Sequence, residues 1–447
     1  MLSEKGTLDL KETILLDILY FQRNKPLMKH FFNTKSSSVL RSTLSLCALF
    51  IFGTVMASNS KIKTQESFLV TLVTPENGMY TVSPELPADG KVAAGTELTV
   101  TATPSEGYSL DVVYYTFKGG MWGTTSIENF TPTMKIVVDK DMSIGATFVE
   151  NNLVENLNVT HDVVYAKPGV KPLKYDVFAP KGAKDLPAVV IIHGGGWSSN
   201  NEDVMRGLAR ELTKGNQYVV FSMDYRWVNN LDGDATPNYM HNLIEDVFGG
   251  IAHIQEHAKE YGADPTKIAV TGDSAGGHLS AAAALLSPMI GDGGFGTTEG
   301  IFEYMPTYMP KGKSVDEVKK EIVDAVQVAA PSYGPFNASD FKQFIQQTDQ
   351  GYLDAVSPSE HVPNVADRAI PHFIVRGTED PIIPDAMIQG YVNLLKEKGQ
   401  TVEYLQVEGA GHAFFDWKPD AQTRATFTKY GVPYAAEMKS FFDSVFY

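Results

Sequence analysis

The stretch that most constrains the fold of this chain is Gly272–Gly277, which reads GDSAGG. The apolar run Lys267–Thr271 precedes it and the small-residue run Ser280–Leu285 follows it, so the sequence predicts a strand, a sharp turn and a helix. The three glycines remove side chains where the backbone turns tightly and where helix meets strand. This is the context of a G-x-S-x-G nucleophile elbow, which exposes the Ser274 hydroxyl at a helix N-terminus, where the dipole favours developing negative charge.

The length and net charge of the chain limit its domain number and its partners. A chain of 447 residues is expected to contain more than one domain. Its formal net charge of −16 makes nucleic acid and anionic membrane surfaces poor partners, because like charges repel. The same negative field suits neutral ligands such as esters and sugars.

A short apolar segment lies near the N-terminus. Leu44–Met56 (LSLCALFIFGTVM) follows the basic residues Lys29, Lys35 and Arg41. Val55 and Ala57 then provide the small residues that a signal peptidase recognises. This pattern predicts a secretory signal peptide cleaved near Ala57, and the segment is too short for a comfortable membrane span. We therefore expect a protein secreted to the periplasm, the medium or the cell surface, with no stable membrane span after cleavage.

Residues 1–57 are thus interpreted as an N-terminal extension and signal peptide. Residues 1–27 resemble an upstream extension, and Met28 is a natural start. Cys47, the single cysteine, lies within the signal segment, so the mature chain is expected to have no disulfide.

The sequence pattern of residues 67–150 predicts a small all-β module. Alternating apolar runs are separated by turn residues, with no helical period; they are Phe68–Val73, Leu98–Thr103, Met134–Val138 and Ser143–Phe148. The phrases PENGMYTV, GTELTVTATPSEGY and DKDMSIGATF resemble the divergent B-repeat modules of bacterial surface proteins, which implies a spacer or adhesion element. Tyr114, Tyr115 and Trp122 could form a sugar-stacking face, but a place in the core is the favoured interpretation.

From residue 158 to 447 the sequence pattern is instead one of alternating strands and helices. This alternation predicts a mostly parallel sheet covered on both faces. The expected strands are Asp162–Ala166, Leu173–Phe178, Ala188–Ile192, Tyr218–Ser222, the elbow strand, Ala325–Ala329, His372–Arg376 and Val402–Gln406. The expected helices are Glu202–Lys214, Asn238–Tyr261, the elbow helix, Asp385–Lys398 and Thr426–Phe442.

One connection in this region is unusually long. Residues 287–324 separate the elbow helix from the next strand and are rich in aromatic residues and methionine. Ser314 and Glu317 form the pattern of a capping box at a helix start. The insertion is either a lid or pocket wall, or a surface excursion packed on its own aromatics.

A glycine triplet follows the buried strand Ala188–Ile192. In His193–Trp197 (HGGGW), glycines let backbone N–H groups approach an oxygen that becomes negative during acyl transfer. Gly195 and Gly196, with the N–H of Ala275, are the predicted oxyanion hole. His193 is interpreted as a structural residue that holds the loop through its ring.

The predicted nucleophile needs a base and a carboxylate that orients it. His412 follows the last strand on a small-residue loop that can reach the elbow, and Asp380 follows the strand before it. Glu379 and Asp416 are the carboxylates set aside. Five other histidines are interpreted as structural: His241, His253 and His257 fall on a helix pattern, His278 in the elbow helix is too close in sequence to Ser274 to face it, and His361 is a weaker rival. The order Ser274, Asp380, His412 is that of the α/β-hydrolase fold.

Together these motifs resemble the α/β-hydrolase esterases of the hormone-sensitive-lipase-like class. They are HGGGW, DYRW at Asp224–Trp227, YGADPTKIAVTGDSAGGHLSAA, SPSEHV, GTEDPIIP and EGAGHAFF. They are most similar to the feruloyl/acetyl-xylan (carbohydrate) esterase branch. The insertion at about 287–324 and Trp227 depart from the family's pattern. The resemblance implies no metal and no organic cofactor, and no ligand cluster in the sequence suggests one.

The resulting hypothesis is a secreted serine esterase that removes acetyl or feruloyl groups from plant polysaccharide or related small esters. Two alternatives stay open. A serine peptidase of the prolyl-oligopeptidase type shares the elbow and the order of the triad, but usually carries a propeller domain. A surface binding or adhesion protein with a vestigial hydrolase domain fits the β-module, although no residue of the triad is missing. The sequence leaves the oligomeric state open.

Overall fold

The computed structural model describes residues 66–120, 123–292 and 303–447. The predicted signal peptide and Cys47 lie outside these ranges, as do Trp122, Phe295 and Phe302. Among the described residues, no helix is both long and apolar enough to cross a membrane.

The strands between residues 67 and 150 form two sheets, in agreement with the all-β prediction. The strand order is β3-β1-β8-β5-β6 in the larger and β2-β4-β7 in the smaller. Period-two alternation directs the apolar side of β4 into a core of its own, where Leu98, Val100 and Ala102 are buried. Tyr114 is buried and Tyr115 packs against that core, which favours the core interpretation for both. The strands are β1 Ser67–Leu72, β2 Gly78–Ser83, β3 Lys91–Ala93, β4 Glu97–Pro104, β5 Tyr108–Lys118, β6 Thr124–Asn129, β7 Thr133–Val137 and β8 Met142–Glu150.

The rest of the described chain is built on an eight-stranded sheet of order β16-β15-β14-β13-β11-β12-β10-β9. Neighbours from β16 to β12 pair in parallel, and β10 pairs antiparallel with both β12 and β9. This is the α/β-hydrolase fold, with the predicted mostly parallel sheet. The strands are β9 Leu157–Ala166, β10 Leu173–Pro180, β11 Leu186–Ile192, β12 Val219–Met223, β13 Ala263–Asp273, β14 Val326–Ser332, β15 His372–Gly377 and β16 Val402–Val407.

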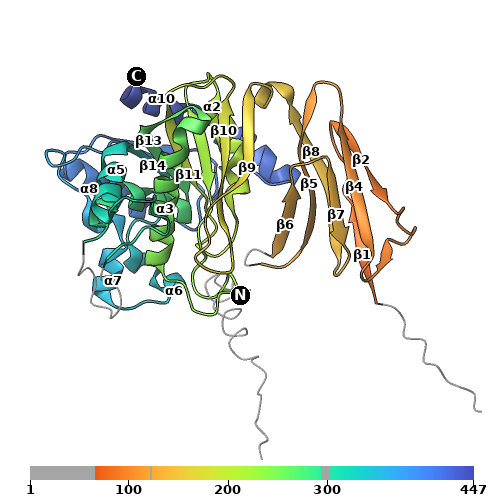
Figure 1. The fold of residues 1–447 in the computed structure, drawn as a ribbon. Helices are drawn as coiled ribbons and strands as arrows, with labels where there is room; N and C mark the ends of the chain where they lie inside the picture. Colours follow the sequence, from red (N-terminus) through yellow and green to blue (C-terminus); the bar gives the residue numbers. More distant parts are fainter. Residues whose placement is uncertain (1–65, 121–122, 293–302) are drawn as a thin grey trace, which may run out of the picture. The chain divides into compact units, whose positions relative to one another are not determined.

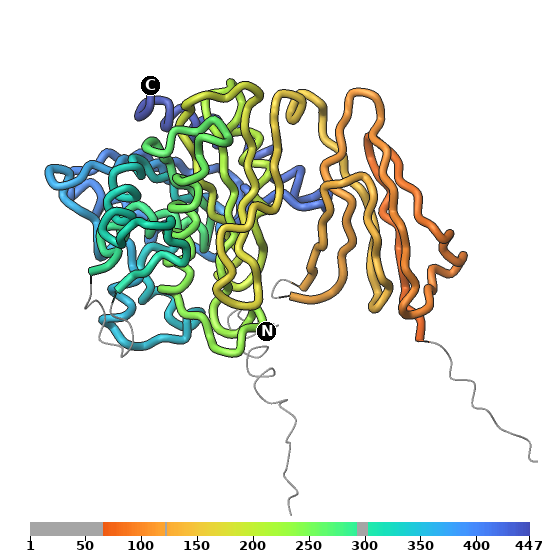
Figure 2. Tube along the Cα trace, viewed as in Figure 1, coloured from red at the N-terminus to blue at the C-terminus, as the bar shows by residue number. Residues whose placement is uncertain are grey.

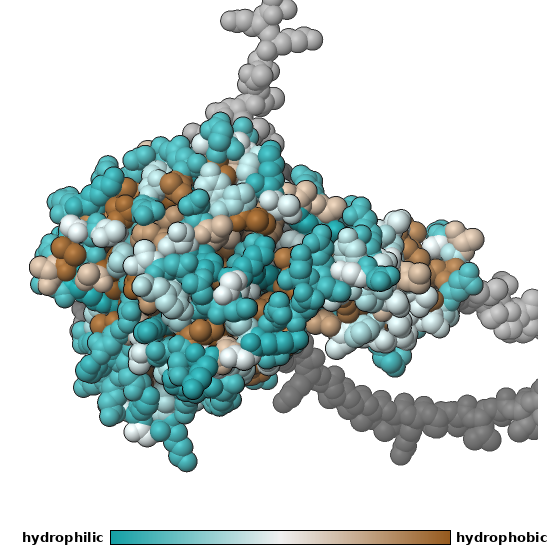
Figure 3. Space-filling model, turned by 90° about the horizontal axis from the view of Figure 1, so that it is seen from above, coloured by the Kyte–Doolittle hydropathy of each residue, from teal (hydrophilic) through white to brown (hydrophobic). Residues whose placement is uncertain are grey.

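Helices cover both faces of this sheet (Figure 1, Figure 2). In β11, Val190 and Ile192 enter one core with the helices α3, α4, α5 and α8, whereas Val189 and Ile191 enter a second core with α2 and α10. Burial on both faces explains the uninterrupted apolar run of this strand. The helices are α2 Arg206–Thr213, α3 Met240–His257, α4 Ala275–Leu285, α5 Val315–Ala325, α6 Lys342–Ile345, α7 Gln350–Ala355, α8 Asp385–Glu397, α9 Ala421–Thr426 and α10 Val432–Phe446. On the face seen in Figure 3, hydrophobic residues lie in small groups separated by polar ones.

The C-terminal helix differs from the single helix predicted at Thr426–Phe442. A π-helical turn, Phe427–Gly431, separates α9 from α10. Pro433 lies in the first turn of α10 and has no N–H for an i−4 hydrogen bond, which favours a wider turn just before it.

The described part of the 287–324 insertion packs on the outside of α3. Tyr304 is fully buried and meets Phe248 of α3 edge to face, with ring centroids 5.6 Å apart. The N–H of Thr307 donates to the carbonyl of Glu245, 3.1 Å away. Helix α5 then begins with the predicted Ser314 capping box. This packing differs from both predicted alternatives, because the described residues pack on α3 and the domain core and neither line the cavity beside Ser274 nor pack only on the insertion's own aromatics.

A buried ion-pair network links β5 to α2. The Asp111 carboxylate accepts hydrogen bonds from Arg206 Nε at 3.0 Å, Arg210 at 2.6 Å and Trp417 Nε1 at 3.0 Å. Arg206 is fully buried and also pairs with Glu128 at 2.8 Å. Although burial alone would raise the pKa of Asp111, the two guanidinium groups hold it far below its ordinary value.

Replacing Asp111 with alanine is expected to destabilise the protein by about 3 kcal/mol, because Arg206 and Arg210 then keep buried charge with fewer partners. Thermal unfolding followed by circular dichroism measures the effect. Asp139→Asn, at an exposed carboxylate in the connection between β7 and β8, is the control. An Asp111→Ala protein that melts with the wild type would contradict the role given to this network.

Candidate active site

Ser274 lies in the turn between β13 and α4 with φ 53° and ψ −117°, which is an unfavourable backbone conformation for a residue with a Cβ. The flanking glycines permit it. A Cβ on Gly276 would come within 1.9 Å of the Ile192 carbonyl oxygen, and one on Gly277 within 2.6 Å of that of Ser332. The predicted elbow geometry is therefore present, and it exposes the Ser274 hydroxyl above the carboxyl end of the sheet.

Two loops bring the predicted base and carboxylate to this serine. His412 Nε2 is 2.8 Å from Ser274 Oγ, and His412 Nδ1 is 2.7 Å from Asp380 Oδ2. Because a carboxylate can only accept, Nδ1 carries the proton and Nε2 is free to take one from the serine. Asp380 follows β15 and His412 follows β16, and these strands are parallel neighbours.

The Asp380 carboxylate is held in place from its other side. Its Oδ1 accepts from the backbone N–H groups of Ile382 at 2.8 Å and Ile383 at 3.0 Å. Burial would raise the pKa of Asp380, but the hydrogen bond with His412 and these two N–H groups lower it below its ordinary value. The group is thus ionised over the whole working range of an enzyme.

Neither of the two other carboxylates near the site has a hydrogen bond with His412 among the described contacts. Among the described contacts, Glu379 is held through its N–H, which donates to the Ala410 carbonyl. Asp416 pairs with Lys418 at 2.8 Å. Both observations agree with the choice of Asp380.

The glycine triplet curves around Ser274. Gly195 has φ 124° and Gly196 has φ 60°, and both line the same cavity as Ser274. A Cβ on Gly195 would lie 2.3 Å from the Ser199 carbonyl oxygen, so only glycine fits. Ala275 follows the serine as the first residue of α4. The oxyanion hole at Gly195, Gly196 and Ala275 stays a prediction with which these placements are compatible.

The other histidines have the structural roles predicted for them. His193 is fully buried, contacts the Gly194 carbonyl at 2.7 Å and Asp224 at 3.1 Å, and stacks on Tyr225. His278 contacts the Val356 carbonyl at 2.8 Å. The remaining three on α3 and the one at 361 contact neighbouring side chains or backbone: His241, His253, His257 and His361.

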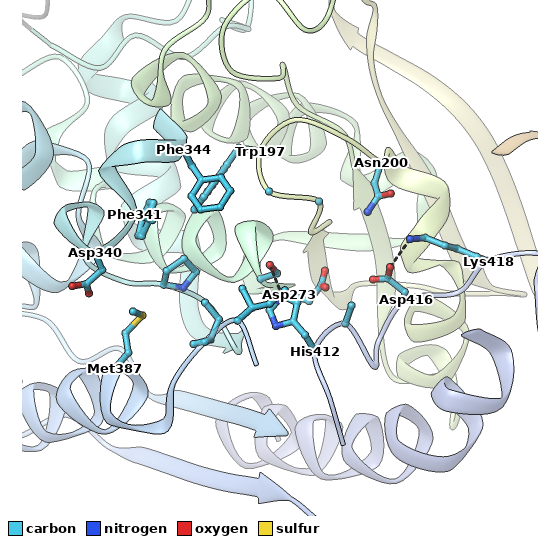
Figure 4. A pocket seen from close by; sticks show the side chains of 17 residues that line it. Trp197, Asn200, Asp273, Asp340, Phe341, Phe344, Met387, His412, Asp416 and Lys418 are labelled. Atoms are coloured by element: carbon cyan, nitrogen blue, oxygen red, sulfur yellow. Dashed lines mark hydrogen bonds and ion pairs between the residues drawn. The ribbon is translucent and has the colours of Figure 1, made fainter. Parts of the chain in front are cut away.

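Ser274 and His412 open into a cavity of about 380 Å³ with two unlike sides (Figure 4). One side, the apolar arm, is lined mainly by Trp197, Pro335, Phe341, Phe344, Ile382, Ile383 and Met387, with the Asp340 carboxylate beside Phe341 and Met387. The other side, the polar arm, is lined by Asn200, Asp416 and Lys418. The catalytic histidine candidate lies between the two arms.

The apolar arm is where sequence reasoning was incomplete. One of the two interpretations left open for the 287–324 insertion made it a lid or pocket wall, whereas the described residues of that insertion do not line the cavity. Phe341, which is 8% exposed, stacks on Trp197 with centroids 4.7 Å apart, and Phe344 is 54% exposed. The signal available was the segment after β14, where Tyr333, Phe336, Phe341 and Phe344 follow one another closely.

Asp273 is a buried carboxylate beside the nucleophile that sequence reasoning did not assign. Its Oδ1 accepts from the Gly194 N–H at 2.7 Å, and its Oδ2 has no hydrogen-bond partner among the described residues. Burial, with the nearby Asp416 carboxylate, raises the pKa of Asp273 to about 7. The residue therefore fastens the glycine loop to the elbow.

Asp273→Asn should change how stability depends on pH. Between the ordinary pKa of 3.8 and about 7 the folded wild type holds more protons at Asp273 than the unfolded chain does, so its stability falls as pH rises through this range. Asparagine keeps the acceptor for Gly194 and has no such loss. The melting temperature of the variant relative to wild type is expected to rise from pH 5 to pH 8, by the equivalent of roughly 1 to 3 kcal/mol. A constant difference across this range would contradict the shifted pKa.

Comparison with known families gives matches to both parts of the chain. Residues 68–152 match the Divergent InlB B-repeat domain. Residues 175–391 match the BD-FAE family model, and this range contains the glycine triplet, Ser274 and Asp380.

Curated relatives are named as esterases. Esterase LipQ of Mycobacterium tuberculosis is 27% identical over 57% of this chain and 57% of its own length. Carboxylesterase NlhH of the same organism is 38% identical over 28% of this chain and 37% of its own length. The chain thus spans little more than half the length of LipQ and about a third of that of NlhH.

Solved structures show partial likeness. Thermogutta terrifontis esterase 2 phosphoramylated by tabun is 24% identical, covers 63% of this chain and 95% of its own, and has a TM-score of 0.45. A truncated carbohydrate esterase from gut microbiota is 21% identical, covers 64% and 95%, and has a TM-score of 0.48. Residues 175–391 are thus similar to the BD-FAE family, and residues 68–152 are similar to the Divergent InlB B-repeat domain.

Proposed function

We propose that this protein is a serine carboxylic-ester hydrolase in which Ser274, His412 and Asp380 form the catalytic triad. The observation that carries the proposal is the hydrogen-bonded chain from Ser274 Oγ through both His412 nitrogens to Asp380, at 2.8 and 2.7 Å. The match to the BD-FAE model and the esterase names of the relatives support the same chemistry.

In this mechanism Ser274 Oγ attacks the ester carbonyl carbon while His412 Nε2 accepts its proton. The N–H groups of Gly195, Gly196 and Ala275 hold the oxygen that becomes negative. His412 returns the proton to the leaving alcohol, and Asp380 stabilises the imidazolium formed in between. Water, activated by His412, then cleaves the acyl-enzyme and frees the acid.

The proposed substrates are plant polysaccharides, or related small esters, that carry acetyl or feruloyl groups. The apolar arm offers the stacked pair Trp197 and Phe341, beside the more exposed Phe344, as a surface for a planar aromatic acyl group. The polar arm offers Asn200 and the Lys418–Asp416 pair as partners for a hydroxyl-rich alcohol. The reaction needs no metal and no organic cofactor.

The proposed location is outside the cytoplasm. The match of residues 68–152 to the Divergent InlB B-repeat domain supports a protein of the cell surface or its surroundings. The predicted signal peptide in residues 1–57 supports export.

The peptidase and the surface binding protein, the two alternative functions, are supported to different degrees. A prolyl-oligopeptidase type of peptidase usually carries a propeller, whereas the described residues before β9 form one sheet of five strands and one of three. A surface binding protein with a vestigial hydrolase keeps the support of the B-repeat match, but the hydrogen-bonded chain at Ser274 favours an active enzyme.

Ser274→Ala is expected to reduce ester hydrolysis by about 10⁴-fold or more, because no nucleophile remains to form the acyl-enzyme. Acyl release from p-nitrophenyl acetate, methyl ferulate and acetylated xylan is measured in parallel for both proteins. A folded wild type that hydrolyses none of these esters would refute the esterase proposal, and binding to xylan without hydrolysis would favour the surface binding protein.

Substitutions in the two arms should separate acyl from alcohol recognition. Phe341→Ala is expected to lower kcat/KM for methyl ferulate about tenfold, since one aromatic contact contributes roughly 1 to 1.5 kcal/mol, while activity on p-nitrophenyl acetate stays within about twofold. Lys418→Gln is the matched change on the polar arm. It should raise KM for acetylated xylan and leave methyl ferulate unaffected. Equal losses on all substrates in both variants would argue against the assignment of the arms.

A further inference from the structure

Three carboxylates meet on the large sheet away from Ser274. They belong to Asp176 of β10 and to Glu202 and Asp203 of the 3₁₀ turn η2 (Glu202–Met205) that leads into α2. One oxygen from each lies within 4.8 Å of the other two. Asp176 is 1% exposed and Glu202 is 2% exposed, whereas Asp203 is partly accessible. Like charges this close and this deeply buried repel one another strongly.

One oxygen of this group has no partner. Glu202 Oε2 is buried and accepts no hydrogen bond from the described residues. By contrast, both oxygens of Asp176 are bound, to the Asp162 N–H at 2.9 Å and to His161 Nδ1 at 2.5 Å. Asp203 Oδ2 accepts from Asn201 at 2.7 Å. A buried carboxylate oxygen without a partner normally has an unseen ion, water or proton beside it.

The cations nearby are engaged elsewhere. Lys174 pairs with Asp162 at 2.6 Å. The Arg206 guanidinium pairs with Asp111 and Glu128, and it reaches only the backbone carbonyl of Asp203. Among the residues that the structure describes, neither Glu202 nor Asp203 forms an ion pair with a lysine, an arginine or a histidine. Lys174 and Arg206 therefore act on these carboxylates only from a distance, and among the described residues His161 alone contacts the group with a basic nitrogen, at Asp176.

We propose that Asp176, Glu202 and Asp203 bind a calcium ion. Calcium takes oxygen ligands in a flexible shell, which suits three carboxylate oxygens that all lie within 4.8 Å of one another. Magnesium requires about 2.0–2.1 Å and a stricter octahedron, and zinc prefers nitrogen and sulfur ligands. Water or backbone carbonyls complete the shell on the side where Asp203 is accessible.

The ion would anchor the end of the glycine loop. Residues 193–197 continue through Asn200 and Asn201 into Glu202, while Asp176 belongs to a strand of the sheet. A cation bound to both segments would tie this loop to β10. Because the ion does not touch the ester or Ser274, its role is stabilisation rather than chemistry, and the proposal is independent of the proposed esterase activity.

The test uses the full mature chain, stripped with EDTA and exchanged into buffer free of chelator. Isothermal titration with calcium chloride is expected to show one ion bound per chain, with a Kd between about 1 µM and 1 mM. The melting temperature should rise by several degrees in 10 mM calcium. Magnesium chloride at the same concentration should bind at least tenfold more weakly.

Glu202→Gln and Asp203→Asn locate the site. Each should abolish the calcium response, and Glu202→Gln should melt no lower than the calcium-free wild type, because it removes an unpaired buried charge. Asp185→Asn, at an exposed carboxylate, is the matched control and should respond like wild type. No calcium uptake by the wild type, uptake that both site variants retain, or magnesium binding of equal affinity would overturn the proposal.

Discussion

The close packing of three backbones around Ser274 is the constraint on which the site depends. The carbonyls of Ile192 and Ser332, at the ends of the strands on either side of β13, approach the elbow so closely that Gly276 and Gly277 cannot carry a Cβ. This packing holds Ser274 at φ 53° and aims its hydroxyl away from the sheet. The strain is maintained because two neighbouring strands, and not the turn alone, determine the backbone there.

The parallel sheet brings the other residues of the candidate site to Ser274. β13, β15 and β16 run in the same direction, so the residues that follow them, Ser274, Asp380 and His412, emerge at one edge although Ser274 and His412 are 138 positions apart. The loop after β11 brings Gly195 and Gly196 to the same edge. Asp273 joins two of these loops by accepting from the Gly194 N–H. Ligand sites at the carboxyl ends of parallel strands are a general consequence of this topology.

Much of the fold and of the candidate site could be predicted because their signals are local. Strand β11 is apolar throughout, since it is buried on both faces, and the glycines around Ser274 mark the turn. The origin of the aromatic pocket wall could not be predicted. Phe341 and Phe344 lie on short 3₁₀ and α turns whose position depends on packing against Trp197, from a distant loop. Its composition made the 287–324 insertion a candidate for this wall, yet the described residues of the insertion pack on α3 instead.

The sequence by itself predicted the alternation of strands and helices, the elbow, and Ser274, Asp380 and His412 as the candidate triad, because each has a signal in a short run of residues. Only the tertiary structure decided which charges meet. Asp111 with Arg206, and Asp176 with Glu202 and Asp203, are brought together by sheet pairing and helix packing between segments far apart in the chain. Their energies depend on burial and on the surrounding partners, which no local pattern specifies.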